Sequence, residues 1–402
     1  MDDARSGSQL MNGVWVRGTI IGRGGGVLGL LAVALSWGVF WGGWAALIPD
    51  LKANLELTNR QLGLALFAAP IAAIPAMLLT GRLAKHLAQR TLPAVTGIFA
   101  LSVLLVGLAS SRWAFAATLL LLGAASGAIE VGLNATIAAR EARDSERLFN
   151  KVQAATPLAM VVSAPAAGLA RDLGASSLVV LTAIAALIMV SAVLAIDPTP
   201  WDPQRPPPPK ANTQSQLLGL LMLVGAVGAS VLLMENAVEQ WGAIHLEQEF
   251  DVDPLVASFG PASYMAGLAV GRILAQWQGA RVPEHTLVLV SGLLGGIGLA
   301  MGAAAWGLEW TLAGFALAGI GLAPVLPTLL SAVGRTVDSQ QRSKAVSVVT
   351  TVSYAGFLLS PPLVGLLAGS FDLSAALGIM ALFGVLVAAG GKVLGLLPKA
   401  RI

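Results

Sequence analysis

Long apolar blocks separated by short polar segments constrain the fold of this chain more than any other feature. We count twelve blocks of ~20 residues, the length that an α-helix needs to cross the ~30 Å hydrocarbon core of a bilayer. Because hydrocarbon offers no partner to backbone N–H and C=O groups, such blocks favour helices. The pattern predicts an all-α membrane protein with twelve transmembrane helices. These cover residues 26–48, 62–80, 92–110, 113–138, 152–170, 176–195, 216–238, 255–275, 286–306, 309–333, 345–368 and 373–396.

Charged residues are too few to cover a soluble globular surface. They make up 11% of the 402 residues, whereas 56% are hydrophobic; soluble proteins carry about 25% charged residues. The net charge of +3 comes from residues grouped in loops, so it reports membrane topology and excludes a nucleic-acid partner. The lipid bilayer is the expected environment.

The positions of lysine and arginine predict the orientation. With both termini in the cytoplasm, the expected outer loops hold only Lys52, Arg60, Arg112 and Arg171 of the 24 basic residues. This excess of positive charge inside is typical of multi-pass proteins of the bacterial inner (plasma) membrane. The first 25 residues lack the apolar core and cleavage site of a signal peptide, so the first span is expected to act as its own insertion signal.

A polar linker divides the chain into two sets of six spans. The segment "DPTPWDPQRPPPPKANTQSQ" contains four consecutive prolines, which favour an extended polyproline conformation and prevent a helix. The predicted segments are a cytoplasmic N-terminus (1–25), an N-terminal six-helix bundle (26–196), the linker (197–215), a C-terminal six-helix bundle (216–396) and a cytoplasmic C-terminus (397–402).

The two halves resemble each other. "SAPAAGLA" from Ser163 matches "SPPLVGLLA" from Ser360 at Ser, Pro and Gly, and "TGRLA" at the end of span two matches "VGRIL" at the end of span eight. Both matches keep the same orientation in the membrane. The sequence therefore predicts a parallel repeat whose halves are related by an axis along the membrane normal.

Several kinds of chemistry are unsupported. The chain has no cysteine, and its three histidines lie in or near predicted loops, so we expect no metal site. No nucleophile–base pair and no phosphate-binding glycine loop is visible. We therefore predict no enzymatic activity and no cofactor.

Glu130 is the most informative residue of the apolar blocks. Gly123 and Gly127 precede it at helical spacing and Asn134 follows at i+4, so all four share one face of span four. Because a charge within a membrane span costs about 2.5–3.5 kcal/mol on insertion scales, such residues usually face a pathway. We interpret Glu130 as a proton-coupling group, with Asn134 binding substrate or orienting the carboxyl. The alternative is a permanently protonated glutamate bonded to a neighbouring helix.

Spans one, five, seven, eight and eleven supply the other candidates. Trp37, Trp41 and Trp44 form a stripe that could stack against a sugar or aromatic solute, or could merely pack or face lipid. In span seven, Glu235 is a candidate for the cavity wall, whereas Glu239 is more simply read as part of a solvated acidic rim. The predicted substrate-binding residues are Asn134, Trp37, Trp41, Trp44, Gln153, Thr156, Glu235, Asn236, Trp241, Tyr264 and Tyr354.

The chain resembles the major facilitator superfamily over essentially its whole length. In that family the loop after span two carries a Gly-x-Leu-Ala-Asp-Arg-x-Gly-Arg motif. Here it reads "GRLAKHLAQR", with Lys85 where the acid is usual. The resemblance implies two six-helix bundles that rock around a midplane site. The expected gating residues are Gly81, Arg82, Lys85, Gly271 and Arg272, although the Gly-Arg pairs could equally be basic anchors beside tight turns.

Two narrower resemblances refine this. "WAALIP" from Trp44 resembles a bacterial inner-membrane branch with a Trp-Ala-x-x-Ile-Pro signature. The Leu-Thr-Asn element at 57–59, the glutamate and asparagine of span four and "QAAT" from Gln153 resemble fucose-type sugar–proton symporters. Those symporters have an additional acid in span one, where this chain has Ala45.

Together these features predict a monomeric secondary transporter that moves a small polar, sugar-like solute together with protons. One alternative is a proton-driven exporter of drugs or metabolites. Exporters of that kind carry a Gly-Pro-x-x-Gly-Gly motif in span five, of which only Pro165 and Gly168 remain here. The other alternative is a membrane sensor that does not transport.

Overall fold

The computed structural model describes residues 20–144, 148–196, 215–278, 281–337 and 339–395. The first half contains α1 (Ile20–Asn54), α2 (Asn59–Leu66), α3 (Ala68–Leu87), the 3-10 turn η1 (Ala88–Arg90), α4 (Thr91–Gly107), α5 (Arg112–Asp144), α6 (Phe149–Asp172) and α7 (Ser177–Leu194). The second half contains α8 (Ser215–Phe250), α9 (Pro254–Gln278), α10 (Glu284–Ala303), α11 (Leu308–Leu322), α12 (Val325–Thr336), α13 (Ser339–Ser370), α14 (Leu373–Ala381) and α15 (Phe383–Gly395). The predicted linker lies almost entirely outside the described residues.

Eleven segments of the described chain are long and apolar enough to cross a membrane. The remaining expected span, 255–275, is α9, which packs between α6, α8 and α11. Large apolar side chains lie exposed on the outside of the assembly; Leu78 and Val162 are 66% and 70% exposed. Such a surface suits lipid and would be unfavourable in water. The predicted all-α membrane fold is confirmed.

Several spans differ from the predicted blocks at their ends or are broken inside. Helix α8 continues twelve residues beyond the predicted 216–238, because polar residues extend a helix past the apolar block that marks the hydrocarbon. Span ten divides into α11 and α12 next to Pro324, which cannot donate a backbone hydrogen bond. Helix α2 begins with a capping box in which Thr58 and Gln61 satisfy each other's backbone N–H groups.

The same helix pairings recur in the two halves. In the first half α1 packs on α6, α3 on α5 and α4 on α7; in the second half α8 packs on α13, α9 on α11 and α10 on α15. The hydroxyl of Ser163 donates to the carbonyl of Gly38, and that of its predicted counterpart Ser360 donates to the carbonyl of Leu233. The predicted repeat therefore corresponds to two six-helix bundles with equivalent internal contacts.

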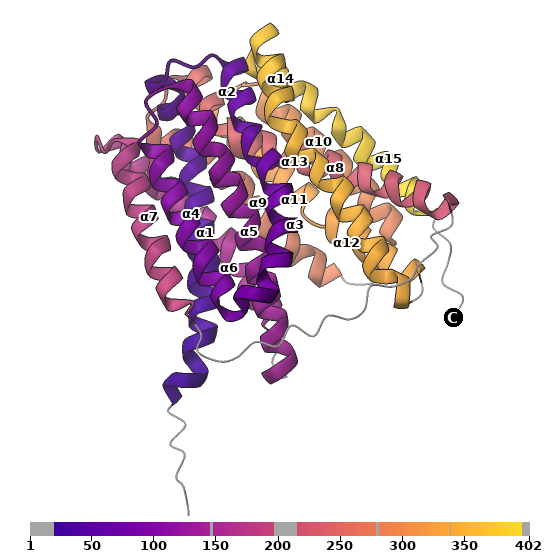
Figure 1. Ribbon diagram of the computed structural model, residues 1–402. Helices are drawn as coiled ribbons and strands as arrows, with labels where there is room; N and C mark the ends of the chain where they lie inside the picture. The colour runs from indigo at the N-terminus through magenta and orange to yellow at the C-terminus, as the bar shows by residue number, and fades with distance from the viewer. Residues whose placement is uncertain (1–19, 145–147, 197–214, 279–280, 338, 396–402) are drawn as a thin grey trace, which may run out of the picture.

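The bundles touch mainly at one end of the molecule, away from the start of α1 and the end of α15. Figure 1 shows the first bundle, indigo to magenta, meeting the second, orange to yellow, at the top of the view and diverging from it below. The contacts are again paired, α6 with α9 and α2 with α13. A Cβ atom on Gly168 would lie 2.5 Å from the hydroxyl of Ser258, and one on Gly365 would lie 2.8 Å from the carbonyl of Asn59. The glycine matched between the repeats is thus the residue that lets the bundles meet.

An ion pair joins the bundles at this closed end. Nη1 of Arg171 on α6 lies 2.8 Å from Oε1 of Glu247 on α8, and it also donates to the carbonyl of Ala46 at 2.9 Å. The two side chains are 9% and 25% exposed. Removing one member of a poorly solvated pair leaves the other charge without its partner, so this pair should stabilise the closed arrangement more than a surface pair would.

We predict that Arg171→Gln increases the fraction of molecules in which the two bundles are separated at the closed end. The chain has no native cysteine, so spin labels can be placed on cysteines introduced at the exposed residues Ala53 and Asp253. The distance distribution between the labels should gain a longer component in the variant. The charge-swapped pair Arg171→Glu with Glu247→Arg should restore the shorter distance. An unchanged distribution in Arg171→Gln would show that the ion pair does not hold this end closed.

Candidate functional site

A cavity of about 400 Å³ lies between the bundles. The first bundle contributes residues of α1, α2, α3, α5 and α6 to its wall, and the second contributes residues of α8, α9 and α13. Ten residues predicted from the sequence line it: Trp37, Trp41, Trp44, Glu130, Gln153, Thr156, Glu235, Asn236, Arg272 and Tyr354. Polar side chains distant in sequence are thereby collected in one compartment inside the membrane.

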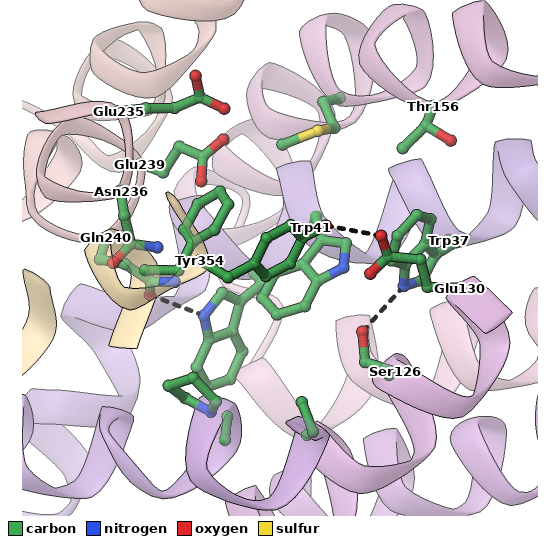
Figure 2. A pocket seen from close by; sticks show the side chains of 18 of the residues that line it. Trp37, Trp41, Ser126, Glu130, Thr156, Glu235, Asn236, Glu239, Gln240 and Tyr354 are labelled. Atoms are coloured by element: carbon green, nitrogen blue, oxygen red, sulfur yellow. Dashed lines mark hydrogen bonds between the residues drawn. The ribbon is translucent and has the colours of Figure 1, made fainter. Parts of the chain in front are cut away.

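Glu130 bonds across the interface between the bundles. The hydroxyl of Tyr354 on α13 donates to Oε1 of Glu130 on α5 at 2.6 Å, and both side chains are half-buried in the cavity wall. Figure 2 shows this bond, with Trp41 and Tyr354 between the Glu130 side of the cavity and the α8 side. The carboxyl group of the first bundle therefore contacts the second bundle directly.

Two glycines hold Glu130 at this place. A Cβ atom on Gly123 would lie 1.9 Å from the carbonyl oxygen of Ala69, and one on Gly127 would lie 2.8 Å from that of Ala73. The absence of side chains lets α5 approach α3 closely along the face that carries Glu130. The two glycines that share a face with Glu130 are therefore the residues that bring α3 against this face of α5.

All three tryptophans of the α1 stripe line the cavity. Nε1 of Trp37 donates to Ser126 Oγ at 3.1 Å, and Nε1 of Trp44 donates to Gln240 Oε1 in the other bundle, also at 3.1 Å. Trp41 packs edge-on against Phe40 and forms no hydrogen bond within the described part of the chain. Trp37 and Trp44 are fixed by their bonds, whereas the indole N–H of Trp41 remains available to a bound molecule.

The opposite side of the cavity is formed by one face of α8, which carries Glu235, Asn236, Glu239 and Gln240 and which we call the α8 wall. Figure 2 shows these four side chains together on one side of the cavity. Glu239 therefore lines the cavity instead of forming the solvated outer rim that we favoured from the sequence. The reason is the length of α8: the helix runs to Phe250, which places Glu239 well before its end.

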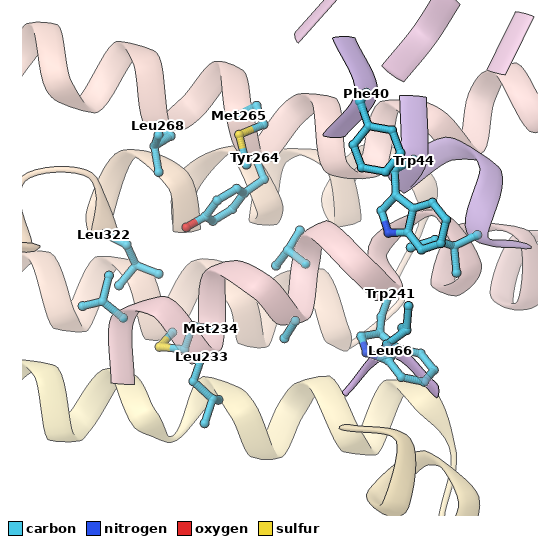
Figure 3. Close-up of a cluster of buried hydrophobic side chains, with 14 of the residues drawn as sticks. Phe40, Trp44, Leu66, Leu233, Met234, Trp241, Tyr264, Met265, Leu268 and Leu322 are labelled. Carbon is cyan, nitrogen blue, oxygen red and sulfur yellow. The ribbon is translucent and has the colours of Figure 1, made fainter. Parts of the chain in front are cut away.

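Three of the predicted substrate-binding residues, Asn134, Trp241 and Tyr264, do not line the cavity, and Thr156 lines it but donates its hydroxyl to the backbone. Asn134 accepts a hydrogen bond from Gln153 Nε2 at 2.8 Å, and Thr156 donates to the carbonyl of Ala34 at 3.1 Å. Tyr264 and Trp241 are fully buried in the apolar cluster of Figure 3. Tyr264 still reaches the site, because its hydroxyl donates to Glu235 Oε2 at 3.4 Å.

The predicted gating residues lie in different surroundings. Gly81 has no neighbouring atom within 4 Å of a Cβ position, and Arg82 is exposed. Gly271 packs against the backbone of Ile320 on α11, and the adjacent Arg272 lines the cavity, where it acts electrostatically on Glu235. The Lys85 side chain lies outside the described part. A cytoplasmic gate formed by these residues stays a prediction.

Sequence reasoning missed several residues of the wall, including Ser126, Met160, Gln240 and Phe357. Ser126 lies one helical turn before Glu130 on the same face, so its place in the cavity wall could have been predicted from the sequence. The bond of Gln240 to Trp44 of the other bundle and the place of Phe357 in the cavity wall depend on tertiary structure. Within the described residues, no group of three or more His, Cys, Asp or Glu side chains could hold a metal ion.

Comparison with known proteins identifies sequence relatives. The sequence profile of the Major Facilitator Superfamily matches residues 27–244 and 226–401. An uncharacterized MFS-type transporter of Yersinia pestis is 26% identical over 350 residues, which cover 87% of this chain and 90% of that protein. Membrane protein MosC of Rhizobium meliloti is 24% identical over 367 residues, 90% of this chain and 89% of that protein.

Solved structures share the fold at low sequence identity. The nucleoside transporter NupG superposes with a TM-score of 0.75 and 13% identity, covering 92% of this chain and 99% of its own. A bacterial homolog to the human lysosomal transporter Spinster, in an inward-facing and occupied conformation, gives a TM-score of 0.77 and 14% identity, with coverage of 94% and 98%.

We predict that Tyr354→Phe weakens the central contact between the bundles, because it removes the hydroxyl that bonds Glu130 and keeps the ring. The distance between spin labels at the exposed residues Arg90 and His285, one in each bundle, should become longer or more broadly distributed. Tyr264→Phe is the matched control, since Tyr264 bonds within its own bundle. An unaltered distribution in Tyr354→Phe would show that this hydrogen bond does not join the bundles.

Proposed function

The chain belongs to the major facilitator superfamily, and from this premise we propose that it is a proton-coupled secondary transporter of a small polar, sugar-like solute. As a member of this superfamily it is a multi-pass membrane transporter and not an enzyme. The proton coupling, the solute class and the direction of transport are the parts that we propose.

The bond between Glu130 and Tyr354 carries the proposal. A hydrogen bond to a charged group contributes about 1.5–3 kcal/mol, whereas one between neutral groups contributes about 0.5–1.5 kcal/mol. Protonation of Glu130 therefore weakens a bond of the arrangement seen here by about 1–1.5 kcal/mol, which corresponds to about tenfold in the equilibrium between this arrangement and one in which the bond is absent. A proton at this position thus changes the relative stability of two bundle arrangements.

Protonation also lowers the cost of enclosing Glu130. A charged carboxylate within the membrane is costly, and a carboxyl group away from water favours its neutral form. In the proposed cycle Glu130 is charged when water reaches the cavity and neutral when the bundles enclose it. The proton gradient then determines on which side of the membrane the protein releases the proton and the solute.

The wall of the cavity supports a polar solute of moderate size. Indole rings offer flat apolar faces for stacking, while amide and carboxyl groups fix hydroxyl groups by hydrogen bonds. Trp41 supplies a ring without an internal hydrogen bond, and Gln153, Asn236 and Gln240 supply amides. A volume of about 400 Å³ lies within the range of small-molecule sites.

The orientation that we propose puts the open end of the molecule at the cytoplasm of a bacterial inner membrane. Among the described residues, Arg82 and Arg90 lie near the end of α3, at the open end (Figure 1), whereas Arg171 belongs to the closed end, and positive charge is favoured on the cytoplasmic side. This arrangement corresponds to an inward-facing transporter, the conformation named for the Spinster homolog. Inward proton flow would then drive uptake.

We predict that Glu130→Gln abolishes uphill accumulation and preserves counterflow, because glutamine resembles the neutral carboxyl and cannot release a proton. Proteoliposomes with an imposed pH gradient would be assayed for uptake of radiolabelled glucose, fucose and glucosamine. The accumulation ratio of any solute taken up should fall to about one in the variant, while exchange across equal pH continues.

Glu309→Gln is the matched control, because Glu309 is exposed in the first turn of α11 and lies outside the cavity wall. It should accumulate solute like the parent protein. Uphill uptake by Glu130→Gln equal to that of the parent would remove Glu130 from the coupling mechanism. Accumulation of solute when the gradient is reversed would indicate export instead of uptake.

A further inference from the structure

The charges that line the cavity do not balance. Three carboxyl groups, those of Glu130, Glu235 and Glu239, share the cavity wall with one guanidinium group, that of Arg272. Glu130 accepts a hydrogen bond from Tyr354, and Glu235 accepts one from Tyr264 and is influenced by Arg272. These two carboxyl groups therefore have partners within the protein.

Glu239 has no such partner. Within the described part of the chain it forms no hydrogen bond and no ion pair, and the charge that acts on it is the like charge of Glu235, one helical turn away. A carboxylate in this position is favoured by any cation that enters the cavity. The imbalance is greatest on the α8 wall, opposite Glu130.

Asn236 provides independent evidence that the α8 wall binds a ligand, because it has an unsatisfied hydrogen-bond acceptor. Its side chain lies in the cavity wall and is 7% exposed. Its Oδ1 atom is buried and has no hydrogen-bond partner in the described structure. Buried acceptors are rarely left unpaired, since an unsatisfied one costs about 1–3 kcal/mol. Rotation of this amide would turn the oxygen toward the cavity, where a donor from a bound molecule would satisfy it.

The indole ring of Trp41, which faces the α8 wall, also suits a positively charged hydrogen-bond donor. Trp41 lies between the α8 wall and Glu130 in Figure 2 and has no hydrogen bond of its own within the described residues. Indole faces attract organic cations. Carboxylate, unpaired carbonyl oxygen and indole face together accept an ammonium group, which donates three hydrogen bonds and carries a positive charge.

We propose that Glu235, Asn236 and Glu239 form a subsite for an ammonium group, so that the solute is an amine-bearing polar molecule such as an amino sugar or amino polyol. This inference rests on the proposed function, whose solute class it narrows. Glu239 supplies the unpaired charge and Asn236 the unpaired acceptor. The hydroxyl groups of the same solute contact the remaining amides and the tryptophan stripe.

Equilibrium binding to the purified full chain tests the subsite. The probes are glucamine and sorbitol, which differ in one position, where glucamine carries an ammonium group and sorbitol a hydroxyl. Isothermal titration should show glucamine binding at least about tenfold more tightly than sorbitol, and Glu239→Gln should remove most of this preference. Asn236→Leu should weaken glucamine binding while leaving Glu239 in place.

Glu249→Gln is the control variant, because Glu249 lies on the same helix but is exposed and bonds Ser374 at the closed end. It should keep the preference of the parent protein, and thermal unfolding of each variant checks that it is folded. Equal binding of the two probes, no binding of either, or an unchanged preference in Glu239→Gln would overturn the ammonium subsite.

The binding experiment separates this inference from the proposed function. Titration needs neither a membrane nor a pH gradient, so a preference for glucamine would stand even if Glu130→Gln accumulated solute normally. Conversely, loss of uphill uptake in Glu130→Gln would stand even if sorbitol and glucamine bound alike.

Discussion

Hydrocarbon offers no hydrogen-bond partner to a polar group, so the polar groups of this chain inside the membrane are favoured where the protein or a cavity can supply a partner. Backbone groups meet this requirement by forming helices. Ionisable side chains meet it in the cavity, where Glu130 and Glu235 accept bonds from tyrosines. The exposed outer surface is left to large apolar side chains such as Leu78 and Val162. The division between an apolar exterior and a polar interior follows from this one requirement.

The arrangement of small residues determines how rigid each interface is. Within the bundles, glycines bring α5 against α3 along its length, and the equivalent pairings of the second half repeat this organisation. Between the bundles, Gly168 and Gly365 permit close packing at one end, where the ion pair of Arg171 with Glu247 adds to it. Two internally well-packed bodies joined at one end can change their relative orientation without repacking their cores, as alternating access requires.

The site combines two kinds of carboxyl group with different surroundings. Glu130 contacts the opposite bundle through Tyr354, so its charge affects how the bundles associate. Glu239 contacts no partner in the described structure and lies beside the unpaired acceptor of Asn236. The proposed division of labour follows from these surroundings: a proton at Glu130 alters the bundle arrangement, and a cationic group at Glu239 identifies the solute.

Much of this architecture was determined by the sequence alone. The apolar blocks specify the spans because their length must match the bilayer, and the matched Ser163 and Ser360 segments specify the repeat. Span four alone indicated that Glu130 faces inward, since its glycines share one helical face. Only the tertiary structure decided that Glu130 bonds Tyr354, that Glu239 lines the cavity and that Tyr264 and Trp241 are buried. The physical reason is that helical periodicity determines which residues share a face, whereas the packing of helices distant in sequence determines what that face meets.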